Sequence, residues 1–469
     1  MNLVAVAPRL GLALVFVLIA PFPGRAQVFH HPRDMGFGDS RFGIGNTAMF
    51  RFQLENGLPG FVVPDLTVPL IQLTAFVRAG RGDDDHQGVA EMLVAAMRRG
   101  PCWMGASGFR QAMNRMAATL EIHMTADLTE ISFNVPAEHA EQGMRVFSGI
   151  IREPCLDREG LEAFRRPGGE GGGTPAFLPP GTGNEPGPLV RDGSLQLAVD
   201  LFHAKLFEGH RYDDVITEQD LTDLALDDVE DFHREFFTPT NMVLAVSGAF
   251  ERRRILQQVD QRFADWEERR PPRLRNASRI ETPPRQTLRY RAGKLQTWIV
   301  IGHELPRVNP RDIPVLQVMN YILGGGHFDT RLFREVRDKR GLANDASGFL
   351  EFNVRGPGSY TFRTYGRHEV AQQLIDIIYA EIDRMQNELV SEEELFVAKG
   401  ALIDGDFAMR FENGGTTART LAEEFVRYGT LDHLIRYPDR VDDVSAEDVR
   451  RAAQRYLDPE RMVEVIMGR

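Results

Sequence analysis

The chain has 469 residues, more than one hydrophobic core usually serves, so two or more domains are expected. Hydrophobic residues make up 42% of the sequence and charged residues 26%, which is ordinary for a soluble globular protein. The formal net charge of −12 argues against nucleic acid or an anionic membrane surface as the main partner.

The first residues have the pattern of a secretory signal peptide. Arg9 supplies a positive charge, residues 10–20 form a short apolar segment, and Gly24 and Ala26 are the small residues expected at a cleavage site. The apolar segment is too short to span a bilayer comfortably. The cleavage point lacks the Cys that a lipid anchor would need. We therefore expect cleavage after Ala26 and a periplasmic or secreted protein without a stable membrane anchor.

Hydrophobic periodicity predicts the same order of elements in each half of the chain. In the first half the predicted elements are a strand over 70–77, helices over 89–100 and from about Phe109, a strand over 129–135 and a helix over 137–151. In the second half they are a strand over 297–301, helices over 314–324 and from about Phe333, a strand over 359–364 and a helix over 369–385. Strands and helices do not alternate as regular βαβ units, so the fold class is predicted to be α+β.

The chain also contains an internal repeat. Residues 228–248 (DVEDFHREFFTPTNMVLAVSG) and 448–468 (DVRRAAQRYLDPERMVEVIMG) both read as an amphipathic helix, a turn with proline, and an apolar strand that ends in Gly. Ser445 and Asp448 give the second of these helices a capping pattern.

The repeat and the composition divide the chain into predicted domains. Residues 27–48 form an arm, and residues 267–286, rich in Pro and Arg, form a linker. Two homologous domains, 49–266 and 287–469, lie on either side of the linker, and the first contains a Gly/Pro-rich loop over 167–188. Duplicated halves of this kind commonly enclose a cavity between them, where ligands bind.

Cys102 and Cys155 are the two cysteines of the chain. In an oxidising compartment such a pair can form a disulfide, and two separate buried thiols are the alternative.

Several short segments follow one another in a characteristic order from about residue 50 to the end. They are Leu54-Glu55-Asn56-Gly57-Leu58, Val77-Arg78-Ala79-Gly80, Gly88-Val89-Ala90, Pro239-x-Asn241-Met242, Leu323-Gly324-Gly325-Gly326, and RLFREVRDKRGLA over 331–343. Together they resemble the pitrilysin/insulinase-type zinc peptidases, a family that includes subunits of the mitochondrial processing peptidase. The resemblance implies two metallopeptidase-like domains that form a clam-like chamber.

Active members of that family carry an inverted zinc motif, H-x-x-E-H, on the helix that corresponds to 89–100. Two His bind zinc, the Glu activates the metal-bound water, and a second Glu further along is the third ligand. The corresponding positions here are Glu91, Val94 and Ala95, and the third-ligand position falls near Glu170. Glu170 lies in the 167–188 tract, whose Gly and Pro residues cannot sustain a helix. The resemblance therefore implies that the zinc site is lost and that no cofactor is bound.

Active members also use an Arg and a Tyr of the C-terminal half to hold the substrate backbone and polarise the scissile carbonyl. Arg337 takes the Arg position, and Asn344 takes the Tyr position. An Asn amide still forms hydrogen bonds but lacks the reach and acidity of a phenol. These two residues are candidates for substrate binding, and an ordinary ion-pair role for Arg337 on a helix surface is the alternative.

The sequence thus favours a peptidase-like subunit that is not catalytic by itself. We expect it to bind peptides or unfolded segments and to form a hetero-oligomer with an active zinc-peptidase homologue, outside the cytoplasm of a Gram-negative bacterium. Two alternatives stay open: an active zinc metalloendopeptidase with unrecognised ligands, and a scaffold or binding protein without a proteolytic partner.

Overall fold

The computed structural model describes residues 44–166, 193–213, 215–269, 284–293 and 295–468, with short stretches at 181–182, 273–274 and 276–280. The predicted signal peptide, most of the arm and most of the Gly/Pro-rich loop lie outside these residues. Within them, every helix is too short or too polar to cross a membrane.

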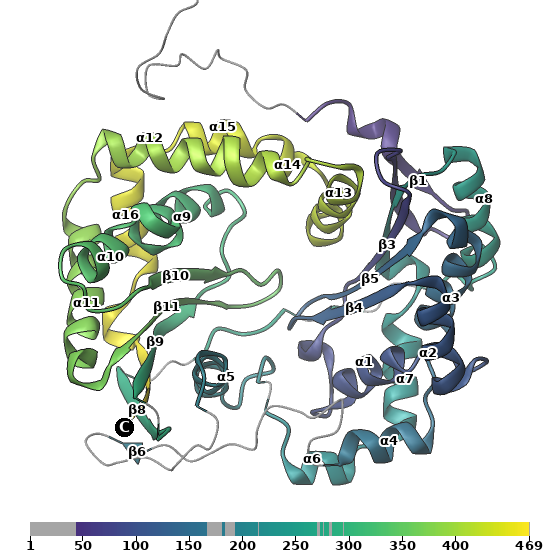
Figure 1. Ribbon diagram of the computed structural model, residues 1–469, viewed down its shortest axis with the longest axis horizontal. Coiled ribbons are helices and arrows are strands. Elements are labelled where there is room, and N and C mark those ends of the chain that lie inside the picture. Colours follow the sequence, from purple (N-terminus) through teal and green to yellow (C-terminus); the bar gives the residue numbers. More distant parts are fainter. Residues whose placement is uncertain are drawn as a thin grey trace, which may run out of the picture. The chain divides into compact units, whose positions relative to one another are not determined.

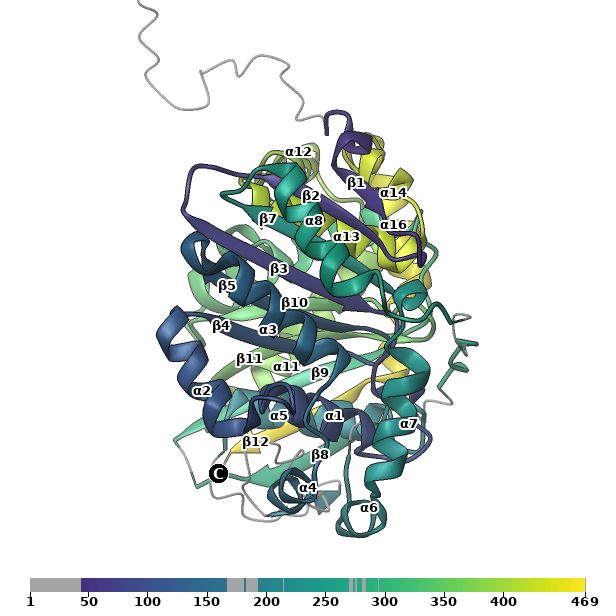
Figure 2. The ribbon, with the colours of Figure 1, turned by 90° about the vertical axis from the view of Figure 1, so that its right-hand side faces the viewer.

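The first half of the chain builds a six-stranded mixed sheet, here called sheet 1 (Figure 1). Its strand order is β1 (Arg51–Gln53), β2 (Pro59–Pro64), β7 (Met242–Gly248), β3 (Leu70–Val77), β5 (Thr129–Pro136) and β4 (Thr119–Met124). The helices of this half are α1 (Val89–Arg98), α2 (Gly105–Met116), α3 (Ala140–Arg152), α4 (Arg158–Arg165), α6 (Glu218–Asp223), α7 (Leu226–Phe236) and α8 (Arg252–Phe263). In Figure 2, α2, α3 and α8 lie in front of one face of this sheet.

The second half builds five strands of sheet 2, which is also six-stranded, and the sixth strand, β6, comes from the first half. Its strand order is β10 (Ala346–Glu351), β11 (Gly358–Arg367), β9 (Gln296–Leu305), β12 (Val463–Gly468), β8 (Gln286–Arg291) and β6 (Gly181–Thr182). Its helices are α9 (Ile313–Asn320), α10 (Arg331–Phe333), α11 (Ala371–Asn387), α12 (Glu392–Gly400), α14 (Asp432–Ile435), α15 (Tyr437–Asp442) and α16 (Ala446–Tyr456).

The two sheets have equivalent topologies, which confirms the α+β class. In each, the strand that closes the repeat lies centrally: β7 runs parallel to β2 and antiparallel to β3, and β12 runs parallel to β8 and antiparallel to β9. The helices before these strands are α7 and α16, as the repeat predicts. Ser445 caps α16 by accepting a hydrogen bond from the Asp448 N–H at 3.2 Å.

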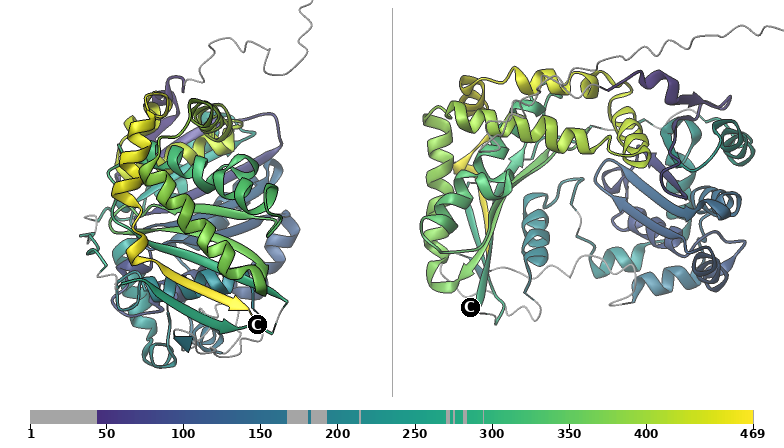
Figure 3. Two further views of the ribbon diagram at one scale, coloured as in Figure 1. Left: turned by 90° about the vertical axis from the view of Figure 1, so that its left-hand side faces the viewer. Right: turned by 45° about the horizontal axis from the view of Figure 1, so that its top comes forward.

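The halves exchange one helix each. Helix α5 (Leu195–Leu206) lies within the predicted first domain but packs on β9 and β12 of sheet 2. Helix α13 (Gly414–Tyr428) lies in the predicted second domain but packs on β2 and β7 of sheet 1 (Figures 1 and 3). Each sheet is therefore covered on one face by a helix from the other half of the sequence.

Each sheet contributes side chains to two hydrophobic cores, because successive side chains of a strand point to opposite faces. Along β7, Leu244 and Val246 point to the core under α1 and α3, while Val243 and Ala245 join the core that contains α13. In β9, Val300 meets α5, whereas its neighbours Ile299 and Ile301 face the large C-terminal core. Successive side chains of a strand point to opposite faces, so strands that are apolar throughout are the ones buried on both faces.

Some predicted helices differ from the observed ones at their ends. The helix predicted over 314–324 is α9, which ends at Asn320 and continues as a π-helical turn over Tyr321–Gly325. A Cβ at Gly324 would lie 2.7 Å from the Gly348 nitrogen of β10, so this glycine permits the close approach of turn and strand. The helix predicted from about Phe333 is only the short α10, followed by a second π-helical turn over Arg334–Asp338.

Candidate functional site

Helix α1 carries the positions of the zinc motif. Gly88 precedes its first residue, and the Asp84 carboxylate caps its first turn. Gly88 has φ of +96°, a left-handed conformation that suits glycine. The Asp84 carboxylate accepts hydrogen bonds from the Ala90 and His86 N–H groups at 3.0 and 3.1 Å. Burial raises the pKa of Asp84 to about 7 despite these bonds. Asp84 therefore organises the start of the helix.

The three motif positions on α1 have the surroundings of a core helix. Val94 is 7% exposed and belongs to the core of the first half, and Ala95 packs against that core. Glu91 is partly exposed and forms an ion pair with Arg81, with 3.6 Å between Nε and Oε1. Zinc needs imidazole, thiolate or carboxylate ligands, and here a single carboxylate, already facing a cation, stands beside two aliphatic side chains.

The described residues at α1 thus do not fit a zinc ion. Among the residues that the structure describes, three or more His, Cys, Asp or Glu nowhere come together as a metal site. The third-ligand position near Glu170 lies outside the described residues.

Next to α1, a buried ionic cluster joins the two halves, and the sequence did not reveal it. Arg355, from the loop between β10 and β11, donates from Nη1 and Nη2 to the two Asp83 carboxylate oxygens, each at 2.5 Å. Its main-chain N–H donates to Asp127 at 2.7 Å. Burial alone would lower the pKa of Arg355, and the Asp83 carboxylate more than offsets this, so the pKa is raised.

Tyr212 completes this cluster by donating from its hydroxyl to the second Asp127 oxygen at 2.6 Å. Burial, together with the nearby carboxylate, raises the pKa of Tyr212, which keeps the phenol protonated and a donor. The run Asp83-Asp84-Asp85-His86 is visible in the sequence, but no sequence signal pairs Asp83 with an arginine far along the chain.

The two candidate substrate-binding residues both lie in the second half of the chain, between α10 and β10. Arg337 is exposed in the turn after α10, and its guanidinium lies 4.9 Å from the Phe333 ring centroid and 5.9 Å from that of Phe328. Asn344 is exposed in the loop that leads into β10. In Figure 1, α10 and α1 are associated with different sheets. Arg337 is thus placed by aromatic stacking.

Cys102 and Cys155 are free thiols that lie near one another. They follow the two residues of an isolated bridge, Pro101 and Pro154, and the Cys102 thiol donates to the Pro154 carbonyl at 3.8 Å. Burial, with the Cys102 thiol beside it, raises the pKa of Cys155 to about 12. Cys155 is consequently a poor nucleophile in this environment.

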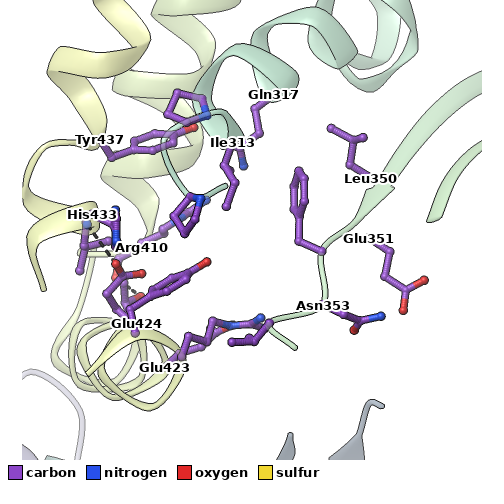
Figure 4. A pocket seen from close by; sticks show the side chains of 18 of the residues that line it. Ile313, Gln317, Leu350, Glu351, Asn353, Arg410, Glu423, Glu424, His433 and Tyr437 are labelled. Atoms are coloured by element: carbon purple, nitrogen blue, oxygen red, sulfur yellow. Dashed lines mark hydrogen bonds and ion pairs between the residues drawn. The ribbon is translucent and has the colours of Figure 1, made fainter. Parts of the chain in front are cut away.

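A cavity of about 510 Å³ lies beside α9, α13, α14 and α15 and the loop between β10 and β11 (Figure 4). Its wall includes Arg410, Glu424, His433 and Tyr437 on the helical side, with Leu350 across from them. Its volume falls within the range of ligand pockets. None of the motif positions of α1 lines this cavity, nor do Arg337 and Asn344.

Comparison with known proteins agrees with this architecture. Residues 223–402 match the family profile described as "Peptidase M16 inactive domain". An uncharacterized zinc protease of Mycobacterium leprae is 27% identical over 277 residues, which cover 57% of this chain and 61% of that relative. The zinc protease YmxG of Bacillus subtilis, also uncharacterized, is 20% identical over 394 residues, 82% of this chain and 90% of its own length.

Solved structures share the fold. A Pseudomonas fluorescens peptidase M16 inactive domain superposes with a TM-score of 0.72 and 19% identity, covering 89% of this chain and 97% of its own. A Helicobacter pylori protease superposes with a TM-score of 0.71 and 17% identity, covering 89% and 99%. Residues 223–402 thus match the M16 inactive domain, and the chain shares its fold with solved M16-like peptidases.

Proposed function

We propose that the chain is a non-catalytic M16-type subunit that binds peptides outside the cytoplasm and pairs with a zinc-bearing homologue. The observation that carries the proposal is the set of residues that α1 has at the positions of the zinc motif. A buried Val94 stands where active relatives need a catalytic base, between Glu91 and Ala95 at the positions of the two zinc-binding His. Without a ligand set and a base, water cannot be activated by the mechanism of this family.

The preserved framework supports a binding role. The helix exchange and the buried Arg355–Asp83 pair hold both halves in the arrangement of a two-domain peptidase. Some members of the family that the chain resembles are heterodimers, in which one subunit carries zinc and the other contributes substrate contacts. Arg337 and Asn344 would make those contacts here.

The proposal is tested with the purified chain and a homologue that has an intact H-x-x-E-H motif, encoded next to it in the genome. The chain alone should contain much less than one zinc per molecule by elemental analysis and should leave a quenched fluorescent peptide library uncleaved. Co-expressed with the homologue, it should co-purify and raise peptide cleavage above that of the homologue alone.

Within such a complex, Arg337→Ala should lower cleavage and raise KM, while Arg253→Ala on the exposed surface of α8 should leave both unchanged. Stoichiometric zinc together with cleavage by the chain alone would instead identify an active metalloendopeptidase. Absence of any complex with the homologue would favour a scaffold without a proteolytic partner. Fractionation of the native host would decide whether the chain lies in the periplasm.

A further inference from the structure

The cavity beside α13 contains buried polar groups that lack partners. Tyr437 is 8% exposed, its ring stacks on Phe407 with 5.1 Å between centroids, and its hydroxyl has no hydrogen-bond partner among the described residues. Gln317, one turn after Ile313 on the same face of α9, likewise has a buried Oε1 without a described partner. Figure 4 shows the Tyr437 ring extending from α15 toward α9. Buried donors and acceptors are nearly always paired, so two orphans in one cavity point to a ligand.

Four arginines and four carboxylates line the cavity, and two of the arginines have no ion-pair partner among the described residues. Arg419 and Arg427 also line the cavity, but they are neutralised by Glu130 at 2.6 Å and by Glu423 at 3.0 Å. Arg410, by contrast, forms no ion pair with the described residues, and its guanidinium lies 5.6 Å from the Tyr437 ring centroid.

Arg440 is the second cation of the wall without a carboxylate partner in the described part of the chain. It donates from Nη1 to the Nδ1 atom of His433 at 3.1 Å, and this bond requires an unprotonated nitrogen on His433. The nearby Glu424 is buried, which raises its pKa to about 7 and leaves it only partly charged at neutral pH. Arg410 and Arg440 therefore remain available to pair with an anionic group.

The opposite part of the wall is mixed, with Glu351 and Asn353 beside a set of apolar side chains. The apolar side chains come from α9, from the end of β10 and from the loop that follows: Ile313, Pro314, Leu350, Phe352 and Val354. Figure 4 shows Leu350 across the cavity from Arg410 and His433. A ligand that fills this space would bury an apolar group against that side while an anionic group reaches the arginines.

We propose that this cavity binds a carboxylate attached to an apolar group, either as a small organic acid or as the C-terminal residue of a peptide. Arg410 pairs with the carboxylate, Tyr437 donates its hydroxyl to it, and the apolar group packs on Leu350 and Phe352. Charge-assisted hydrogen bonds of this kind are about twice as strong as neutral ones. The site does not depend on pairing with a zinc peptidase, so it is tested on this chain alone.

The test is isothermal titration of the chain with three probes: N-acetyl-phenylalanine, a hexapeptide that ends in Phe with a free carboxylate, and the same peptide amidated at its C-terminus. At least one free acid should bind, and the amidated peptide should bind about tenfold more weakly or not at all, because it lacks the charge. Tighter binding of the peptide than of the small acid assigns the site to peptide ends; equal binding assigns it to small acids.

Two variants place the binding in the cavity. Arg410→Gln should weaken binding of the free acid about tenfold, and Tyr437→Phe about threefold to tenfold. Tyr437→Phe should fold at least as stably as the wild type, since it removes a hydroxyl that has no partner in the free protein. Arg253→Gln on α8 is the control and should bind as the wild type. No binding of either free acid, equal binding of the amidated peptide, or binding untouched by both cavity variants would each overturn the proposal.

Discussion

Among single residues, Val94 shows most directly that α1 has the packing of a core helix. Almost the whole of α1 is buried: Val89, Met92, Leu93 and Met97 face the core together with Val94. A glutamate at this position would lose its hydration without gaining a metal or a paired cation. The packing around Val94 therefore favours an aliphatic residue, and a change of this one residue would not create a catalytic base.

Introducing the H-x-x-E-H motif into α1 should destabilise the fold and should give only weak zinc binding. Val94→Glu is expected to lower the free energy of unfolding by roughly 2–4 kcal/mol, because it buries an unpaired carboxylate. The triple variant Glu91→His, Val94→Glu, Ala95→His should still bind zinc weakly, since a catalytic zinc site needs three protein ligands. Urea unfolding and zinc titration against a chelator measure the two effects. Ala95→Glu, at a partly exposed position, is the control and should cost less; nanomolar zinc affinity of the triple variant would contradict the expectation.

Glu424 should give the protein a measurable pH dependence. Its folded-state pKa is raised by burial from 4.5 to about 7, so between these values the folded state holds a proton that the unfolded state has released. Stability then falls as pH rises through this window, by roughly 3 kcal/mol at most. Glu424→Gln keeps an acceptor for the Leu434 N–H and should flatten this fall.

Urea unfolding at pH 5 and pH 8 measures this slope. Glu412→Gln, at an exposed position in the turn before α13, is the control and should leave the slope as in the wild type. Asp84, whose pKa burial also raises to about 7, should preserve part of the slope in Glu424→Gln. An unchanged slope in that variant would show that Glu424 ionises normally.

At the scale of elements, α13 is attached to sheet 1 at both ends and in the middle. The Asp65 carboxylate accepts from the Gly414 N–H at 2.8 Å, at the positive end of the helix. At the other end, Arg78 donates from Nε to the Val426 carbonyl at 2.8 Å. Arg419 on the exposed face forms two hydrogen bonds to Glu130, at 2.6 and 2.7 Å. Charges from the first half of the chain thus complement the dipole of a helix from the second.

The glycine at the start of α13 should be needed for this contact. A Cβ on Gly414 would lie 2.6 Å from the Asp65 Cβ and from the Ser247 Oγ, so Gly414→Ala forces the helix away from sheet 1. We expect a loss of about 1–3 kcal/mol in the free energy of unfolding. Gly400→Ala, at the end of α12 with open space around its Cβ, should instead gain up to about 1 kcal/mol. Denaturant unfolding compares the two; equal effects would mean that the close approach of α13 is not required.

The elements themselves could largely be predicted from the sequence, but the exchange of α5 and α13 could not. Strand β3 and helix α1 were expected at their observed starts, because their apolar patterns are local. The apolar face of α5 shows only that it must be buried, and both sheets offer an apolar face. Contacts that decide between them, such as Phe202 of α5 against Gly302 of β9, join residues distant in sequence. The partnerless Tyr437 hydroxyl could not be predicted either, because it follows from the packing of α15.

At the scale of the whole molecule, the two halves are joined by a buried charge pair as well as by the exchanged helices. Arg355 and Asp83 are almost inaccessible, with side chains 9% and 2% exposed. A second arginine, Arg419, makes a pair of similar geometry with Glu130 across the same halves, but its side chain is 46% exposed. The chain therefore offers a natural comparison of one buried and one solvated bidentate pair.

Removing the buried partner should be far more costly than removing the solvated one. Arg355→Met leaves Asp83 with only the more distant cation Arg211, at 3.7 Å, and deprives the buried Asp127 of its ion pair with Arg355, so we expect a loss of about 3–5 kcal/mol in the free energy of unfolding. Arg419→Gln should cost at most about 1 kcal/mol, since exposed pairs are screened by water and salt. Because α5 and α13 still interlock the halves, Arg355→Met should keep a single unfolding transition with a lower midpoint.

A double-mutant cycle separates the coupling energy between Arg355 and Asp83 from the effect of each substitution alone. Asp83→Asn with Arg355→Met should be clearly more stable than the sum of the two single losses implies, because the double variant removes both charges of the pair and leaves only Asp127 without its arginine. Urea unfolding of the four proteins at neutral pH gives the coupling energy. Equal losses for Arg355→Met and Arg419→Gln would mean that water reaches the Asp83 carboxylate once the arginine is gone. The helix exchange alone would then account for the association of the halves, and the buried pair would serve only to fix the loop between β10 and β11.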